Sequence, residues 1–230
     1  MGVIAGLISS IVIIFPTGDM HGKYVARNQP AAIAAMEGLF KTESGAGMVL
    51  MGQPNEETGQ IDNPLVVNDL LSFLIYGTTK AEVQGLDQIP HDQWPTALPL
   101  LFYAYHIMAG LGTWFVLLMI VCAFLLWRDR LTQSRWALWA LLLSFPLPYI
   151  ANTAGWMTAE LGRQPWLIYG LMRTSEGFSN TVSASNGLFT LIGFMGLYAL
   201  LGLLFTVLIY REISTGPEPK AAEVEAAHVA

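Results

Sequence analysis

The sequence contains few charged residues, a single cysteine and no run of basic residues. Only 12% of its 230 residues are charged, about half the share of roughly 25% that is usual in soluble domains. The hydrophobic share is 53% and the mean hydropathy is +0.49, so these values indicate an integral membrane protein. The net charge of −6 and the lack of a basic run argue against nucleic-acid binding.

The one cysteine, Cys122, lies inside an apolar run, so the chain forms no internal disulfide and this thiol is expected to pack as a small hydrophobic group. Common catalytic and metal-binding motifs are also missing. There is no glycine-rich phosphate loop, no Cys or His pair at zinc spacing and no Gly-x-Ser-x-Gly. Function must therefore be sought among the polar residues inside and beside the apolar runs.

The apolar runs predict an all-α integral membrane protein with about four transmembrane helices and a long external loop that carries short helices. The expected segments are transmembrane helices 1–16, 97–127, 136–160 and 186–210, loops 17–96, 128–135 and 161–185, and a tail 211–230. The tail is rich in Ala, Glu and Pro and is expected to be disordered. Residues 1–16 are shorter than the roughly 20 residues that a span needs, and they lack the features of a signal peptide. We therefore expect a membrane helix whose beginning is missing or frayed.

Proline and glycine indicate further structure inside these segments. In the long loop, Asn28-Gln29-Pro30 predicts the start of a short helix, a second short helix is expected at Leu70–Tyr76, and Gly45–Gly59 is rich in turn residues. In the third span, prolines at 146 and 148 are expected to kink the helix. Asn186 is expected to cap the fourth.

The basic residues predict an orientation. The loop 128–135 carries three arginines, whereas the long loop 17–96 carries four basic and ten acidic residues. By the positive-inside rule, the loop 128–135 and the C-terminus lie in the cytoplasm and the long loop lies outside.

An acidic residue stands near the end of the third span. Glu160 lies one helical turn after Trp156, which in turn follows Asn152, so the three form a stripe along one helix face. A carboxylate inside a membrane helix is unfavourable unless it faces a partner or a cavity, and it therefore indicates a functional site. The alternative at this stage is that Glu160 reaches the interface and pairs with Arg163, three residues later.

The segments GWMTAE (Gly155–Glu160) and GRQPW (Gly162–Trp166) resemble the signature of subunit I of the cytochrome bd quinol oxidases. The resemblance implies that Glu160 is an axial ligand of the high-spin heme b. It also implies that Trp156 lies among the hemes and that Arg163 lies close to their propionates.

Two other segments carry the resemblance. QPAAIAAMEG (Gln29–Gly38) is similar to the quinol-binding loop, which implies that Glu37 takes part in quinol oxidation, although Ala32 stands where many members have a lysine. From the residues alone, Glu37 would be a solvated acid on a surface helix. FYAYHIMAG (Phe102–Gly110) is similar to the segment that supplies a methionine to the low-spin heme b.

The second of these segments implies that Met108 is an axial ligand of heme iron, with His106 as a polar partner for a heme propionate and, less well, as a ligand. Two residues apart on a helix correspond to a rotation of about 200°, so His106 and Met108 point to opposite faces and do not bind one metal together.

The resemblance implies a heme-containing part of a terminal oxidase in the bacterial cytoplasmic (inner) membrane. It would oxidise quinol at the outer face, reduce oxygen to water and contribute to a proton gradient. The implied cofactors are two hemes b and a heme d, or a b-type heme in its place, and the donor is ubiquinol or menaquinol.

Only the C-terminal part of the family's subunit is covered, so the chain is expected to be a fragment or one piece of a split subunit and to be inactive alone. Expected partners are the upstream helices of subunit I, a second subunit and membrane lipid. A di-heme cytochrome b anchor would need about four intramembrane histidines, and the spans contain only His106. A non-catalytic membrane subunit or scaffold of a respiratory or transport complex remains the alternative.

Overall fold

The computed structural model describes residues 1–179 and 181–216. The chain divides into two compact units, Met1–Gly177 and Phe178 onward, which are described separately. The fold is mainly helical, and four helical stretches are long and apolar enough to cross a membrane, namely Gly2–Asn28, Leu98–Trp127, Arg135–Arg163 and Ala184–Thr215. The expected all-α membrane fold is therefore confirmed.

The first unit contains the following helices, in order: α1 (Gly2–Val12), the π-helical turn η1 (Ile13–Gly18), α2 (Asp19–Asn28), α3 (Pro30–Glu37), α4 (Leu70–Tyr76), the short 3-10 turns η2 (Leu86–Gln88) and η3 (His91–Gln93), α5 (Leu98–Trp127), the 3-10 turn η4 (Leu131–Gln133), α6 (Arg135–Leu143), α7 (Leu147–Arg163) and the 3-10 turn η5 (Thr174–Glu176).

The first helical stretch continues beyond residue 16, where the sequence suggested an end. Pro16 interrupts the helical hydrogen bonds, and Phe15 leaves the helical conformation there. The Thr17 hydroxyl donates to the carbonyl oxygens of Val12 at 2.6 Å and Ile13 at 2.8 Å. Because these carbonyls keep partners, the chain passes the proline as a kink and runs on through α2.

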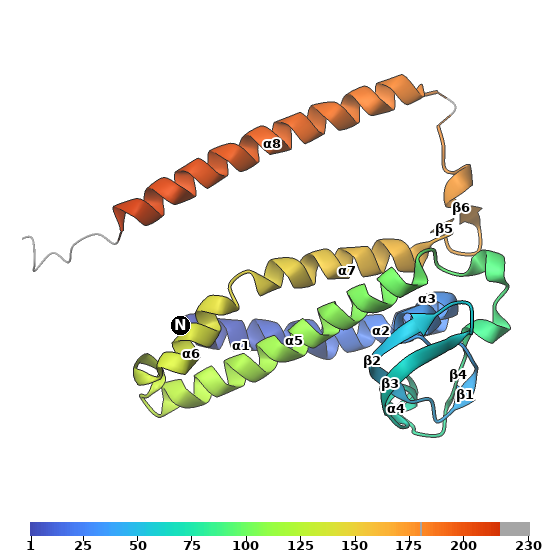
Figure 1. Cartoon of the computed structure of the whole chain (residues 1–230), viewed down its shortest axis with the longest axis horizontal. Helices are drawn as coiled ribbons and strands as arrows, with labels where there is room; N and C mark the ends of the chain where they lie inside the picture. Colours follow the sequence, from blue (N-terminus) through green and yellow to red (C-terminus); the bar gives the residue numbers. More distant parts are fainter. Residues whose placement is uncertain (180, 217–230) are drawn as a thin grey trace, which may run out of the picture. The chain divides into compact units, whose positions relative to one another are not determined.

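Three long helices form the body of the first unit. Helix α5 packs along both α1 and α7, and Figure 1 shows the three running side by side. The prolines of the third span divide it into α6 and α7, as the sequence indicated, with a break at residues 144–146. In this break the buried Ser144 hydroxyl accepts a hydrogen bond from the Trp114 indole N–H of α5 at 3.0 Å.

The segment between α2 and α5 folds against one end of these helices and contains strands that the sequence did not predict (Figure 1). The strands β2 (Met48–Asn55) and β3 (Gln60–Val67) form an antiparallel hairpin, from the pair Met48 and Val67 to the pair Asn55 and Gln60. Two further antiparallel pairs join β1 (Glu43–Ser44) to β4 (Glu82–Val83), and β5 (Trp166–Ile168) to β6 (Met172–Arg173). The turn-rich segment Gly45–Gly59 is therefore largely strand.

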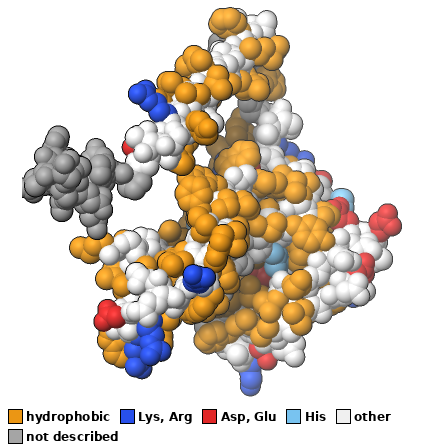
Figure 2. Space-filling view, turned by 60° about the vertical axis from the view of Figure 1, so that its left-hand side comes forward, with side chains coloured by type: hydrophobic (Ala, Val, Ile, Leu, Met, Phe, Trp, Pro, Cys, Tyr) orange, Lys and Arg blue, Asp and Glu red, His pale blue; other side chains and the backbone are white. Residues whose placement is uncertain are grey.

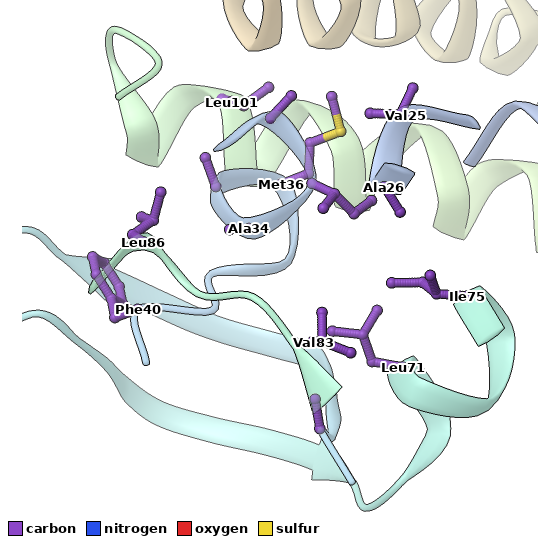
Figure 3. Packing of buried hydrophobic residues seen from close by; sticks show 14 of the residues in the cluster. Val25, Ala26, Ala34, Met36, Phe40, Leu71, Ile75, Val83, Leu86 and Leu101 are labelled. Atoms are coloured by element: carbon purple, nitrogen blue, oxygen red, sulfur yellow. The ribbon is translucent and has the colours of Figure 1, made fainter. Parts of the chain in front are cut away.

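Helix α3 forms the centre of the core of the first unit. It begins with Pro30 in its first turn and ends at Gly38, whose φ of 67° is left-handed. Its residues Ala31–Glu37 are all buried. Figure 3 shows Ala34 and Met36 among side chains from neighbouring elements; the labelled neighbours are Val25, Ala26, Phe40, Leu71, Ile75, Val83, Leu86 and Leu101.

The surface differs between the helices and the folded loop. Figure 2 shows hydrophobic side chains over most of the visible surface, whereas acidic side chains gather mainly at the right-hand edge. Along α5, for example, Leu117, Ile120 and Phe124 are exposed. Such surfaces are expected where helices face lipid or other apolar segments.

The second unit contains α8 (Ala184–Thr215) among its described residues. The helix is capped by Ser183, whose hydroxyl accepts from the Asn186 amide at 3.3 Å, so the prediction that Asn186 is the cap is wrong. Asn186 lies inside the first turn because Ser183 supplies the side-chain acceptor. Of the expected tail, Arg211–Thr215 continue the helix and residues 217–230 lie outside the described residues.

Gly38 allows the turn at the end of α3, and this suggests a test. A Cβ at residue 38 would lie 2.5 Å from Ile61 Cδ1 and 3.1 Å from Phe102 Cε2, and its φ of 67° favours glycine. We expect Gly38→Ala to lower the free energy of unfolding by about 1–2 kcal/mol, the cost of a left-handed residue with a Cβ. Thermal unfolding of the purified protein measures this loss of stability.

Gly22→Ala in α2, where no atom lies within 4 Å of the new Cβ, is the control and should be neutral or stabilising. Equal melting temperatures for Gly38→Ala and wild type would contradict this account.

Candidate functional site

Glu37 is the last residue of α3, and its side chain is buried. Only 3% of the residue is exposed, because α3 lies against both α5 and α7. The Tyr105 hydroxyl of α5 donates to Glu37 Oε1 at 2.6 Å. The interpretation from residues alone, a solvated acid on a surface helix, is therefore wrong, since the tertiary packing of α3 removes this carboxyl from water.

The burial of Glu37 alters its acid–base behaviour. Desolvation raises the pKa of Glu37 above its ordinary value of 4.5, and the hydrogen bond from Tyr105 and the charge interaction with His106 counteract part of this rise. The second carboxyl oxygen, Oε2, is buried and has no hydrogen-bond partner among residues 1–179 and 181–216. A buried carboxyl with an unpaired oxygen is suited to proton exchange with a bound molecule.

Ala32 is 1% exposed and buried in the core. A Cβ built on Gly162 of α7 would lie 3.7 Å from Ala32 Cβ and 2.7 Å from Met36 Cε. The close approach of α3 and α7 depends on these small residues.

His106 faces the hairpin. Its Nε2 lies 2.7 Å from the Val49 carbonyl oxygen of β2, and its Nδ1 lies 2.8 Å from the Phe102 carbonyl oxygen of its own helix. Its ring also lies against Phe102, with centroids 3.9 Å apart. Carbonyl oxygens only accept hydrogen bonds, so a hydrogen on Nε2 lets His106 donate to the hairpin and a hydrogen on Nδ1 lets it donate to Phe102.

A pocket of about 390 Å³ and another of about 320 Å³ lie in the first unit. The smaller one lies between the hairpin and the segment that follows Glu37, and it borders Gly38, Lys41, Glu43, Val49 and Gln60. The larger one is an apolar groove between α5 and α7, lined by residues that include Tyr103, Ile107 and Met157. The smaller pocket thus has mixed apolar and polar walls, and it borders Gly38, the residue after Glu37.

The predicted heme ligand Met108 points toward α7. Its sulfur would lie 2.9 Å from a Cβ built on Gly155, and the side chain is half-buried. The thioether therefore lies at the contact between the two helices, on a different side of α5 from the His106 contact with the hairpin.

Glu160 and Arg163 lie at the end of α7 and form an ion pair, Arg163 Nη2 to Glu160 Oε1, at 3.5 Å. Both side chains are 43% exposed, and an exposed pair of this kind stabilises a protein by about 1 kcal/mol or less. Trp156, one turn earlier, is 64% exposed. The pairing considered as the alternative for Glu160 is thus present, beside a large exposed aromatic surface.

The predicted heme residues fall into two places. Glu160 follows Gly155, the neighbour of Met108, by five residues, which corresponds to about 7.5 Å along the helix and about 140° around it. Met108 and Glu160 are therefore not brought to one position. Of the two side chains, the thioether is a known type of axial heme ligand.

No group of three or more His, Cys, Asp and Glu side chains that could hold a metal ion occurs in the described part of the chain. Axial heme ligation needs one or two protein side chains for each iron, so it does not require a cluster of three or more.

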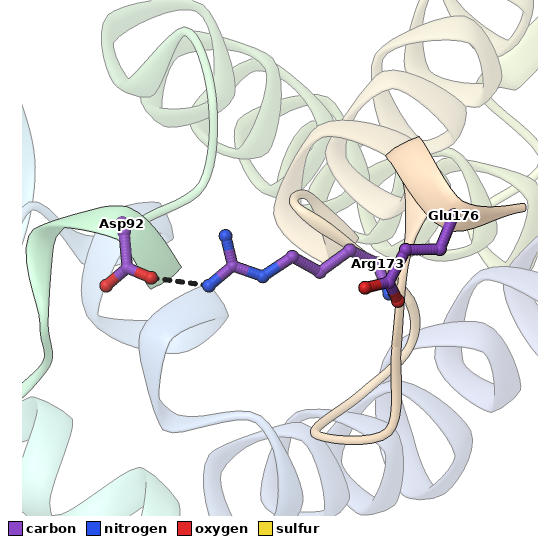
Figure 4. Close-up of polar contacts among 3 residues, drawn as sticks. All are labelled: Asp92, Arg173 and Glu176. Carbon is purple, nitrogen blue, oxygen red and sulfur yellow. Dashed lines mark hydrogen bonds and ion pairs between the residues drawn. The ribbon is translucent and has the colours of Figure 1, made fainter.

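Arg173, after α7, makes polar contacts that the sequence did not predict. Arg173 forms an ion pair with Asp92, and its backbone N–H donates to Glu176 Oε2 at 2.9 Å (Figure 4). The guanidinium also lies over the Trp166 ring, 5.5 Å from its centroid. These contacts tie the segment after α7 to the segment before α5. The ion pair could not be predicted from the sequence, because Arg173 and Asp92 are 81 residues apart.

Comparison with known proteins gives consistent matches. The family model described as cytochrome bd terminal oxidase subunit I matches residues 1–217. The cytochrome bd ubiquinol oxidase subunit 1 of Bacillus subtilis (strain 168) is 31% identical over 212 residues, covering 88% of this chain and 45% of that protein. A putative cytochrome bd menaquinol oxidase subunit I of the same strain is 32% identical over 215 residues, covering 90% of this chain and 46% of that protein.

A solved structure is also similar. The bd oxidase from Geobacillus thermodenitrificans is 34% identical with a TM-score of 0.72, covering 92% of this chain and 48% of that chain. The chain thus spans about half the length of the curated relatives that it matches.

The buried Glu37 predicts a pH-dependent contribution to stability. Because its pKa is raised in the folded protein, the folded state binds more protons than the unfolded state between the ordinary value of 4.5 and the raised value. The free energy of unfolding therefore falls as the pH rises through this interval. Glu37→Gln does not titrate, so its melting temperature relative to wild type should increase with pH. Parallel thermal unfolding from about pH 4 to about pH 8 measures this. A difference that is constant, or that decreases with pH, would contradict the burial of an ionisable carboxyl here.

Proposed function

Because this chain belongs to the cytochrome bd terminal oxidase subunit I family, we propose that it is part of a membrane complex that oxidises quinol and reduces oxygen to water. The chain would supply the quinol-oxidising loop and some of the heme-binding residues. The activity of the full-length relatives is proposed here for an assembly that contains this chain, since the chain spans about half their length.

The observation that carries this proposal is the buried Glu37 carboxyl, one residue before the wall of the smaller pocket. The smaller pocket, about 320 Å³ in volume, lies at the low end of the range of small-molecule sites and borders Gly38. A quinol head group presents two hydroxyl groups, and a hydroxyl placed toward Glu37 would provide the partner that Oε2 lacks among the described residues.

Glu37 would act as the proton acceptor. Oxidation of a quinol to a quinone releases two protons and two electrons. In the ionised form, Glu37 would accept one of the protons from a quinol hydroxyl, while Tyr105 holds the other carboxyl oxygen in place. The second proton would pass to water on the outer side, and the two electrons would pass to the bound hemes. A general base works best when its pKa lies near the working pH, and burial shifts the pKa of Glu37 in that direction.

The heme groups would be held partly by this chain. Met108 on α5 and Glu160 on α7 are the proposed axial ligands of two different hemes b, with Trp156 beside them and Arg163 near their propionates. When bound, the hemes, including a heme d or a b-type heme in its place, accept the electrons and supply the oxygen chemistry. His106 contacts the hairpin, so its proposed role toward a propionate would require a different side-chain position.

The proposed setting is the bacterial cytoplasmic membrane, with the loop of residues 17–96 outside and the C-terminus in the cytoplasm, as the arginines of residues 128–135 favour. The proposed partners are the remaining helices of a complete subunit I, a second subunit, and ubiquinol or menaquinol. Two of the similar proteins are named, respectively, as a ubiquinol and a putative menaquinol oxidase subunit, so both donors are supported.

Removing the charge of Glu37 tests the proposed base. We expect Glu37→Gln to lower the turnover of quinol oxidation by about 100-fold in the assembled complex, the usual contribution of a positioned base, without loss of heme. Oxygen consumption with added quinol and the reduced-minus-oxidised absorbance spectrum measure the two quantities. Glu57→Gln, at the exposed turn of the hairpin, is the control. Normal turnover of Glu37→Gln would contradict the proposed role, and loss of heme would assign Glu37 a structural one.

Replacing the sulfur of Met108 tests the proposed ligand. Met108→Leu keeps nearly the same volume but removes the thioether, so the spectrum of the low-spin heme b should weaken or shift. Met119→Leu is a matched control, because Met119 is on the same helix and its sulfur packs in the same way, 2.9 Å from a Cβ built on Gly6 of α1. If both variants have the wild-type spectrum, Met108 only fills the contact between α5 and α7.

A further inference from the structure

His106 connects the hairpin to α5 directly beside the candidate quinol pocket. Its Nε2 lies 2.7 Å from the Val49 carbonyl oxygen, and Val49 is one of the residues that line this pocket. A hydrogen on Nε2 makes this bond. His106 therefore touches the wall of the pocket through the backbone of β2, without reaching into the pocket itself.

The hairpin has an apolar contact with the same region from its second strand. Ile61 of β3 also lines the pocket, and its Cδ1 would lie 2.5 Å from a Cβ on Gly38, the residue after Glu37. Phe102 of α5 lies close to the same position, 3.1 Å from that Cβ, and its ring packs against the His106 ring at a centroid distance of 3.9 Å. The end of α3, the hairpin and α5 thus meet at Gly38.

Much of the hairpin surface is exposed, so it does not help to hold the hairpin in place. Its strands carry exposed hydrophobic residues, among them Leu50, Met51 and Leu65, and most residues of β3 are exposed. A two-stranded hairpin is only marginally stable by itself, so its position depends on the few contacts with the rest of the unit. Among these, the His106 bond is a hydrogen bond from a side chain of α5 to the hairpin backbone.

We propose that His106 is a positioning residue for the candidate quinol site: by donating to the Val49 carbonyl oxygen, it docks the β2–β3 hairpin on α5 and so sets the shape of the pocket wall beside Glu37. The docking itself is independent of the reaction, whereas the effect on quinol binding rests on the proposed function. The chemical class that the pocket would take is a quinol head group, and His106 would govern its binding and not the proton transfer.

The test separates docking from substrate binding by two measurements on the assembled complex. His106→Phe keeps an aromatic ring against Phe102 but has no donor. His106→Gln keeps an N–H at a position similar to that of Nε2. Thr113→Val is the control: Thr113 is also on α5, and its hydroxyl donates to the Ala109 carbonyl oxygen at 3.0 Å, away from the hairpin contact.

Amide hydrogen exchange of residues 48–67 reports docking. Loss of one hydrogen bond should make exchange about 3- to 10-fold faster in His106→Phe, with His106→Gln and Thr113→Val near wild type. The KM for quinol reports positioning. We expect it to rise several-fold in His106→Phe, with kcat per heme retained and with rescue by glutamine.

Unchanged exchange in His106→Phe would overturn the docking role. Faster exchange with an unchanged KM would overturn the positioning role, because the hairpin would then be held by His106 without consequence for the substrate. If the wild-type assembly oxidises no quinol, the proposed function fails, and the exchange measurement still decides whether His106 docks the hairpin.

Discussion

The hydrogen bond between Glu37 and Tyr105 is the contact on which the candidate site depends. It joins the end of α3 to α5 across 68 residues of sequence, at 2.6 Å, in a place with almost no access to water. A hydrogen bond to a buried charged group contributes about 1.5–3 kcal/mol, and removal of the tyrosine hydroxyl would leave both carboxyl oxygens without partners among the described residues. The carboxyl is tolerated there because Tyr105 satisfies one oxygen, and the other remains available.

The packing of α3 makes this arrangement possible. Its small residues bring it close to α7 at Gly162, and the left-handed Gly38 turns the chain sharply toward the hairpin. One short helix therefore links the apolar body of the first unit to its polar loop. Glu37, the proposed proton acceptor, is the last residue of this helix.

The sequence predicted the parts that depend on local chemistry. The membrane helices followed from apolar length, the start of α3 from Pro30, the helix Leu70–Tyr76 from its own pattern, and the break before α7 from Pro146. The hairpin was missed because β2, with Gly52 and Pro54 in its second half, has no clear alternation of apolar and polar residues. The burial of Glu37 and the contact of His106 with Val49 were missed because their partners lie 68 and 57 residues away. The site residues came from resemblance to a family, and the structure adds to them Tyr105, Val49 and the pair of Arg173 with Asp92.

The central claim is that Glu37 is a buried, hydrogen-bonded carboxyl that exchanges a proton with quinol. Infrared difference spectroscopy of the assembled complex, recorded on addition of quinol, tests this most directly because a protonated carboxyl has its own C=O stretching band. The account predicts a carboxyl band that grows when quinol is added, because the ionised Glu37 takes up a proton from the quinol. This band should shift in Tyr105→Phe and be absent in Glu37→Gln. A spectrum without a carboxyl band that depends on Glu37, or with a band that does not respond to quinol, would contradict it.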